Sequence, residues 1–145
     1  MEKEAWGYAR MFALATRAKV KDCIVKENVI VVIVNSNVPY VIGYKGCHVN
    51  VLSRLWGKRI KVVEWADTPE QFIKNFVRVP VVIKKEQEEI KVYVSTENIR
   101  RVIGKNGRNA NLLRFLVKKY FPNAPKLKFI QVFDQLEGKK NDKKK

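Results

Sequence analysis

A six-residue pattern, Val-Ile-Gly-X-X-Gly, occurs twice in this chain of 145 residues and constrains its fold more than any other feature. The copies occupy residues 41–46 and 102–107, so their glycines lie 61 residues apart. Each copy follows a strand-like run and opens a helix-like one. A period of this length indicates a repeated structural unit, and we predict two small modules of similar fold.

The repeat extends beyond the glycines. When the chain is shifted by 61 residues, the apolar run 29–34 falls on 90–95, and both runs have the β-branched and aromatic composition of strands. Downstream, three apolar residues of one helical face fall on three of another: Val49, Leu52 and Leu55 on Ala110, Leu113 and Leu116. A strand is predicted after each helix, over 59–64 and 127–133. We expect the second helix to be about two turns longer and to end after Tyr120.

A further helix and strand precede each of these cores. Amphipathic helices are predicted over 4–19 and 68–77, the second with Thr68 as its N-cap. Short strands are predicted over 22–25 and 79–84. Each half therefore reads helix, strand, strand, short helix, glycine loop, helix, strand.

These patterns predict an α+β fold in which each unit is a three-stranded mixed sheet packed on one side by about three helices. The expected boundaries are 1–66 for the first domain and 67–136 for the second. Residues 137–145 contain no apolar side chain and are predicted to form a disordered basic tail.

The main strands of the two copies differ in one respect. In the second copy apolar residues alternate with Lys91, Tyr93 and Ser95, as expected for a sheet with one wet face. In the first copy the corresponding outer residues are also apolar: Ile30, Val32 and Val34. We expect this outer face to be covered by the other module, a partner protein or a second copy of the chain.

The charge balance indicates a polyanionic partner. The chain has 30 Lys and Arg against 14 Asp and Glu, a net charge of +16. Residues 1–66 carry +6, residues 67–136 carry +7 and residues 137–145 carry +3, so both modules are basic. A single-sign excess of this size is typical of proteins that bind nucleic acid.

The two glycine loops are suited to a phosphate backbone. The first glycine of each loop allows a sharp turn, and the second leaves the unpaired amides of the next helix open to an anion. The candidate RNA-binding residues are Gly43, Tyr44, Lys45, Gly46, Gly104, Lys105, Asn106, Gly107 and Arg108. About four nucleotides of single-stranded RNA would lie along such a loop, with their bases in an adjoining apolar groove.

Other polar residues are weaker candidates for RNA contact. Asn37 and Asn98 precede the two loops and are candidates for reading bases. Lys58-Arg59 and Lys118-Lys119 either extend the basic track or are ordinary charges at helix C-termini.

The remaining motifs predict no enzyme, cofactor, metal or small-molecule substrate. Cys23 and Cys47 lack disulfide or metal-site spacing, and His48, the only histidine, has no ligand cluster in the sequence around it. No nucleophile–base set and no P-loop or dinucleotide motif occurs. The N-terminus lacks a signal-peptide pattern, and polar residues interrupt the longest uncharged run. We therefore expect a cytoplasmic monomer with no membrane contact.

The sequence resembles two K-homology (KH) domains in series. KH domains are known for Val-Ile-Gly-X-X-Gly between two helices, followed three positions later by an apolar residue, here Val49 and Ala110. The helix and strand before each core resemble the type II arrangement. The resemblance implies tandem type II KH domains that bind single-stranded RNA.

Over residues 5–134 the chain is similar to the short archaeal form of the NusA family of transcription termination and antitermination factors. Segments 16–24 and 60–64 carry the likeness beside the first loop, and 107–113 carries it beside the second. Two residues depart from the family pattern: Tyr44, at a position where a small or basic residue is commoner, and Pro39, in the segment before the loop. The resemblance implies a role in termination or antitermination, with RNA polymerase as a further partner. A KH protein of ribosome assembly or the ribosome, and a scaffold whose KH surface binds protein, stay open as alternatives.

Overall fold

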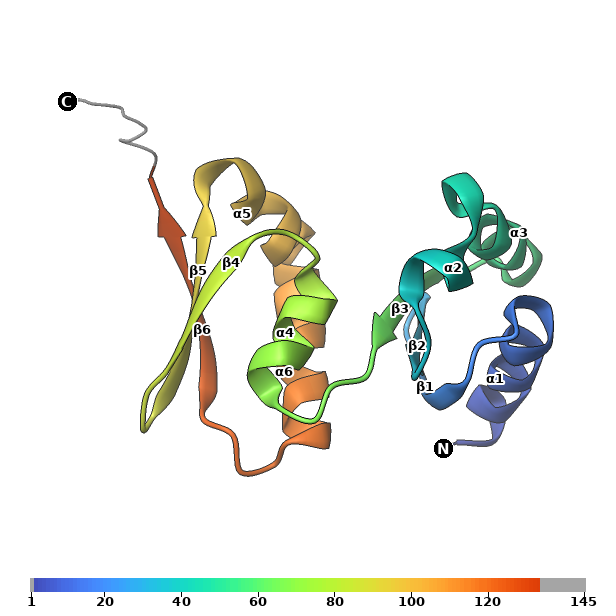
Figure 1. The fold of residues 1–145 in the computed structure, drawn as a ribbon, viewed down its shortest axis with the longest axis horizontal. Coiled ribbons are helices and arrows are strands. Elements are labelled where there is room, and N and C mark those ends of the chain that lie inside the picture. The colour runs from blue at the N-terminus through green and yellow to red at the C-terminus, as the bar shows by residue number, and fades with distance from the viewer. Residues whose placement is uncertain (1, 134–145) are drawn as a thin grey trace. The chain divides into compact units, whose positions relative to one another are not determined.

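The chain divides into two compact units, Met1–Trp65 and Ala66–Lys145, in a computed structural model that describes residues 2–133 (Figure 1). The first unit contains α1 (Lys3–Thr16), β1 (Val20–Lys26), β2 (Val29–Val34), α2 (Val38–Ile42), α3 (Cys47–Trp56) and β3 (Arg59–Glu64). The second contains α4 (Pro69–Val77), β4 (Val81–Lys85), β5 (Glu89–Ser95), α5 (Thr96–Ile103), α6 (Arg108–Tyr120) and β6 (Lys126–Val132). The order of elements predicted from the repeat is thus confirmed. The predicted tail, 137–145, lies outside the described residues.

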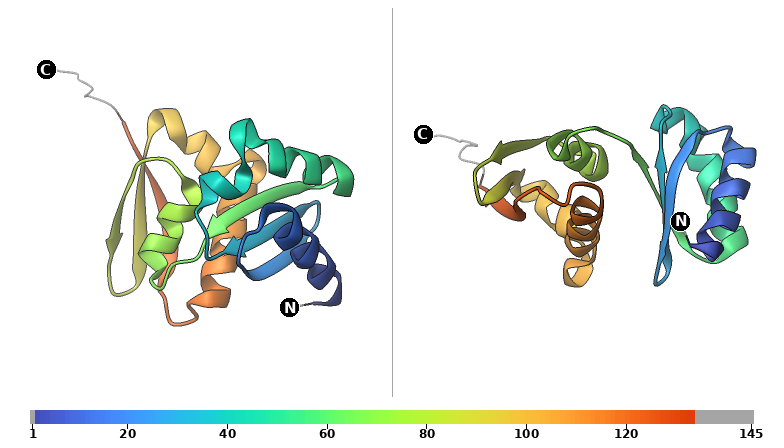
Figure 2. Two further views of the ribbon diagram at one scale, coloured as in Figure 1. Left: turned by 45° about the vertical axis from the view of Figure 1, so that its right-hand side comes forward. Right: turned by 90° about the horizontal axis from the view of Figure 1, so that it is seen from below.

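Each unit has a three-stranded mixed sheet with helices gathered on one face (Figure 2). The strand orders are β1-β2-β3 and β4-β5-β6, with the first pair antiparallel and the second pair parallel in both units. This confirms the predicted α+β fold class. A parallel pair requires a crossover connection, and in both units the crossover consists of two helices joined by the glycine loop. Among the described residues, no helix is long and apolar enough to cross a membrane.

Local sequence signals account for the helix ends. Thr68 caps α4 by accepting a hydrogen bond from the Gln71 amide at 3.3 Å, as predicted. The first helix ends at Thr16, three residues earlier than expected, because Arg17 adopts a left-handed conformation with φ 62°. The Thr16 hydroxyl donates to the Phe12 carbonyl at 2.7 Å and accepts from the Ala18 amide at 3.2 Å. One side chain therefore serves both the last turn and the exit from the helix.

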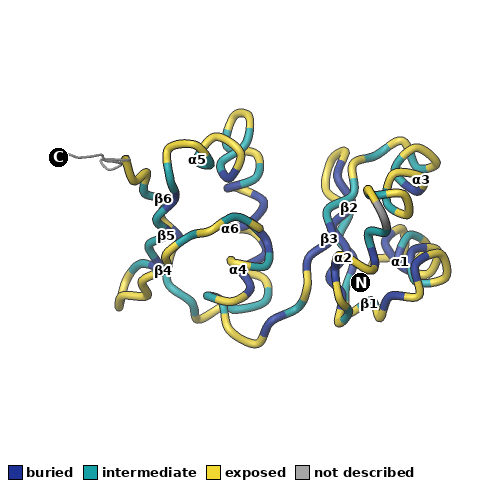
Figure 3. Tube along the Cα trace, turned by 45° about the horizontal axis from the view of Figure 1, so that its top comes forward, coloured by how far each residue is buried: buried dark blue, intermediate teal, exposed yellow. Residues whose placement is uncertain are grey.

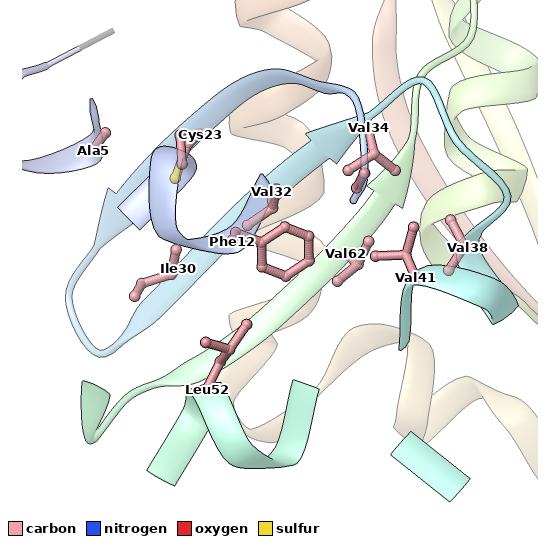
Figure 4. Packing of buried hydrophobic residues seen from close by; sticks show 12 residues of the cluster. Ala5, Phe12, Cys23, Ile30, Val32, Val34, Val38, Val41, Leu52 and Val62 are labelled. Atoms are coloured by element: carbon pink, nitrogen blue, oxygen red, sulfur yellow. The ribbon is translucent and has the colours of Figure 1, made fainter. Parts of the chain in front are cut away.

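The core of the first unit corrects the expected orientation of β2. Ile30, Val32 and Val34 do not form an outer face: they lie with Phe12 of α1 and Leu52 of α3 in the core between sheet and helices (Figure 4). The opposite face of the strand carries Val29, Val31 and Ile33, and all six residues of β2 are buried. The strand is apolar on both faces, as its sequence indicates. The prediction assigned the core-facing residues to the outer face and the outer residues to the core.

The cause is a one-residue difference between the two copies. Nine positions separate Val34 from Gly43, whereas ten separate Val94 from Gly104. A shift of 61 residues therefore aligns the loops, and a shift of 60 aligns the core-facing residues of the central strands. Because side chains alternate along a strand, an error of one residue moves every side chain to the other face.

Candidate nucleic-acid interface

The two glycine loops have nearly the same backbone. Gly43 has φ 87° and ψ 171°, and Gly104 has φ 80° and ψ 166°, a region that is essentially confined to glycine. In each loop the second glycine donates its amide to the carbonyl of the first at 3.0 Å, Gly46 to Gly43 and Gly107 to Gly104. The repeat in sequence is thus a repeat in conformation.

The first glycine of each loop is required by close packing as well as by its backbone conformation. A Cβ on Gly104 would lie 2.9 Å from the backbone nitrogen of Asn109. A Cβ on Gly43 would lie 2.8 Å from the ring of His48 and 3.0 Å from Cys47 Sγ. The start of the second helix therefore packs directly on the first glycine, against rigid backbone in one unit and side chains in the other.

One side chain ties each loop together, His48 in the first unit and Asn109 in the second, and sequence reasoning missed their role. His48 lies 3.1 Å from the Val41 carbonyl through Nδ1, which acts as the donor because a carbonyl only accepts. Asn109 occupies the equivalent position and donates from Nδ2 to the Arg101 carbonyl at 3.0 Å. Both bonds join the start of the second helix to the last turn of the first. The 61-residue shift aligns His48 with Asn109 and is the signal that could have revealed this role.

The N-termini of α3 and α6 are open at the loops. Each helix begins after the second glycine of its loop, and neither has a side-chain cap hydrogen bond. In α6 the first amide, that of Arg108, already donates to the Lys105 carbonyl, so the amides that follow it are the ones left at the end of the helix. The amides of an uncapped helix N-terminus carry the positive end of the helix dipole. The glycines of both loops are half-buried, whereas four predicted site residues are exposed: Lys45, Lys105, Asn106 and Arg108. Figure 3 colours the trace by burial and shows exposed stretches at both α3 and α5. Tyr44 opens the short 3-10 turn of the first loop, Tyr44–Gly46.

An apolar hollow of about 390 Å³ adjoins the second loop. It is lined by Ile99 and Ile103 of α5 and by Gly104. Arg100 and Lys105, both exposed, also contribute to its lining. An apolar surface with cations at its border, next to an open helix N-terminus, fits the base and the phosphate of one nucleotide respectively.

Three of the weaker candidates, Asn37, Asn98 and Lys58, have structural roles. Asn37 is the N-cap of α2 and accepts a hydrogen bond from the Tyr40 amide at 3.1 Å. Asn98 donates to the Ser95 hydroxyl at 3.2 Å at the start of α5. Lys58 donates to the Glu27 carbonyl at 3.3 Å. These contacts fix local structure, so we do not retain either asparagine as a base-reading residue.

Comparison with known proteins agrees with this geometry. A family model described as KH domain matches residues 10–68. Among solved structures, the crystal structure of APE1850 superimposes with a TM-score of 0.70 at 25% sequence identity, covering 91% of this chain and 100% of that one. Residues 10–68 are therefore similar to the KH domain, a module whose Gly-X-X-Gly loop holds the RNA backbone. The fold of the two units is that of tandem type II KH domains.

Proposed function

We propose that this KH-domain protein binds single-stranded RNA through both glycine loops and acts in transcription termination or antitermination. The observation that carries the RNA-binding part is the duplicated loop: two Gly-X-X-Gly turns of matched backbone, each at an uncapped helix N-terminus with exposed cations. The net charge of +16 favours the same class of partner.

In the proposed complex amides in the first turns of α3 and α6 bind phosphate oxygens; in α6 these are the amides after Arg108, whose own amide donates to the Lys105 carbonyl. Lys45 of the first loop, and Lys105 and Arg108 of the second, are exposed beside those amides and neutralise neighbouring phosphates. The bases that follow lie over the hollow lined by Ile99 and Ile103 in the second unit. Binding of this kind recognises an unpaired strand, because a paired base cannot enter the hollow.

The RNA-binding part is tested by replacing both variable pairs with aspartate in the full chain: Tyr44→Asp, Lys45→Asp, Lys105→Asp and Asn106→Asp. RNA affinity, measured by fluorescence anisotropy, should fall at least about 100-fold because charged groups then repel the phosphates where the amides would bind them. Thermal unfolding should change little, since Lys45, Lys105 and Asn106 are exposed.

A charge-matched control separates the loops from the overall charge. Lys3→Asp, Lys84→Asp and Lys85→Asp together change the net charge by the same amount at exposed sites outside the loops. This variant should lose much less affinity than the loop variant. Equal losses would assign binding to diffuse charge, and unchanged RNA affinity of a folded loop variant would favour a scaffold that binds protein.

The transcription part rests on the resemblance of segments 16–24, 60–64 and 107–113 to the NusA family. Affinity purification of the tagged protein from cell extract, followed by mass spectrometry, tests it. RNA polymerase subunits that persist after nuclease treatment support a transcription factor. Pre-ribosomal particles in their place would support the alternative role in ribosome assembly.

A further inference from the structure

A second hollow, of about 410 Å³, lies in the second unit at the end of α6 remote from the glycine loop. It is enclosed by the last turns of α6, the connection 121–125 and the first residues of β6. Val117, Pro125 and Leu127 form part of an apolar wall. A hollow of this volume lies within the range of roughly 300–1,000 Å³ that is usual for small-molecule sites.

The hollow is not part of the repeated architecture. In the first unit only Gly57 and Lys58 join α3 to β3, whereas five residues join α6 to β6. The second helix has 13 residues against 10, so the expected extension of two turns is wrong: the added length is three residues of helix and a longer connection. Two prolines restrict the backbone of that connection, and the Ala124 amide closes a turn by donating to the Phe121 carbonyl at 2.9 Å.

The mouth of the hollow is positively charged. Arg114, Lys118 and Lys126 are all exposed and contribute to its lining, which contains no acidic residue. The Arg114 guanidinium lies 5.4 Å from the centroid of the Phe129 ring and donates to Asn111 Oδ1 at 3.3 Å. These contacts hold the arginine over the strand at the edge of the hollow. Apolar walls with cations at the opening fit a planar base that carries a phosphate.

The glycine loop and the hollow lie at opposite ends of one rigid helix. Lys118 is eleven residues beyond Gly107 along α6, a separation of about 16 Å at the helical rise per residue. We propose that the hollow binds one further unpaired nucleotide of the same RNA strand that the second glycine loop holds. The proposal rests on the proposed RNA-binding function and adds a second contact point outside the loop.

A pair of neighbouring lysines provides the matched test. Lys118 lines the hollow, whereas Lys119 is exposed on the same helix turn and is not among the lining residues. Lys118→Glu and Lys119→Glu change the net charge equally. With RNA of about ten nucleotides, Lys118→Glu should weaken binding about tenfold more than Lys119→Glu. With RNA of about four nucleotides, which only covers the loop, the two variants should bind alike.

The base contact is tested by filling the hollow. Ala124→Trp adds no charge and occupies the space between the connection and α6. In wild type, one base of the longer RNA is removed while its sugar and phosphate are kept. At the one position that reaches the hollow, this removal should lower RNA affinity about tenfold. In Ala124→Trp the same base removal should not lower RNA affinity any further, because the tryptophan already occupies the hollow. Retained affinity for the short RNA shows that the variant is folded, and Lys118→Glu provides the independent variant should it not fold.

The outcomes separate the two hypotheses. If wild type binds the short RNA, and Lys118→Glu and Lys119→Glu lose equal affinity for the longer RNA, the hollow is not a nucleotide site. RNA binding by the glycine loops would be unaffected by that result. No binding of either RNA by wild type would instead overturn the proposed function. If free adenosine or uridine monophosphate binds in the hollow while the longer RNA binds no more tightly than the short one, the site takes a free nucleotide. The proposed contact with the RNA strand would then be wrong.

Discussion

The two units present the same loop backbone in different chemical surroundings. Around the second loop, residues 96–120 contain seven Lys and Arg and one acidic residue, whereas residues 35–57 around the first contain two basic residues and no acidic one. Both loops have the same turn geometry and an uncapped helix behind them. Backbone conformation therefore sets where a phosphate would bind, and the surrounding charges set how strongly. We expect the second unit to contribute more of the RNA affinity.

The helices before the loops differ as well. In the first unit α2 has five residues and begins at the Asn37 cap, whereas in the second α5 has eight residues and follows β5 directly. Tyr40 on α2 is 66% exposed, and Arg101, 61 positions later, is exposed on α5. Sequence reasoning missed Tyr40. Aromatic rings and guanidinium planes both stack on bases, so each unit offers a stacking group there by different chemistry.

The largest expected effect comes from adding a methyl group to the first glycine of each loop. Gly104→Ala should lower the free energy of unfolding by about 3 kcal/mol, because the residue keeps a strained φ and its Cβ meets the immovable Asn109 backbone. Gly43→Ala should cost less, about 2 kcal/mol, since the His48 and Cys47 side chains can rotate away. Denaturant unfolding of the full chain measures both.

Gly7 supplies the control for this pair. It lies inside α1, and a Cβ there would meet nothing within 4 Å. Gly7→Ala should therefore raise the free energy of unfolding by about 0.5–1 kcal/mol through helix propensity. Equal losses for the two loop variants would show that conformational strain alone, rather than contact with the next helix, requires the first glycine.

The second prediction concerns the loops taken one at a time. Lys105→Asp with Asn106→Asp should weaken RNA binding about 100-fold, through lost and repelled phosphate contacts. Tyr44→Asp with Lys45→Asp should weaken it about tenfold, because fewer basic residues surround that loop. Both double variants change the net charge equally, so each is the control for the other. A larger loss of affinity for the first-loop variant would show that the first unit contributes more of the RNA affinity.

The parts of this molecule that were predictable from sequence are local ones. The glycine loops, the Thr68 cap and the order of strands and helices follow from residue types at short spacings. The facing of β2 was not predictable from the 61-residue shift, because a single extra residue before the second loop reverses the alternation. The hollow beside α6 was also missed, since it exists only when the helix, the connection and β6 come together in space.

Salt dependence gives a third, smaller contrast. If about six phosphates are neutralised, the logarithm of RNA affinity should fall with the logarithm of salt concentration at a slope of about −4. Removing Lys105 and Arg108 by alanine substitution should make the slope shallower by about 1.4, and removing Lys45 by about 0.7. Titrations of RNA at four or more salt concentrations measure the slopes. A slope near zero for wild type would contradict phosphate binding altogether.

The two cysteines allow the first loop to be blocked chemically. Cys47 is exposed at the start of α3, whereas Cys23 is buried. Burial, with a smaller contribution from Asp22, raises the pKa of Cys23 from 9.0 to about 12, so its thiol stays protonated and unreactive near neutral pH. A bulky maleimide should then modify Cys47 alone and lower RNA affinity several-fold. Mass spectrometry counts the adducts, Cys47→Ser is the control, and reaction of Cys23 should begin only as the pH rises towards 12 or the unit unfolds.

The smallest expected effect lies at the second variable position of the loops. Lys45 and Asn106 both adopt a left-handed conformation, with φ 52° and 58°. Asparagine tolerates this region better than lysine, whose penalty is about 1 kcal/mol. Lys45→Asn should therefore stabilise the first unit by up to about 1 kcal/mol while removing a cation from its loop. The reciprocal Asn106→Lys should destabilise the second unit by a similar amount while adding one.

Stability and RNA affinity should thus move in opposite directions in both of these variants. This result would identify Lys45 as a residue whose charge is kept at a cost in stability, as expected for a phosphate contact. Denaturant unfolding and RNA titration of the same protein samples measure the two quantities. If Lys45→Asn were more stable and bound RNA as tightly as wild type, the first loop would hold its phosphate through backbone amides alone, and the contrast between the two units would rest on the cations of the second.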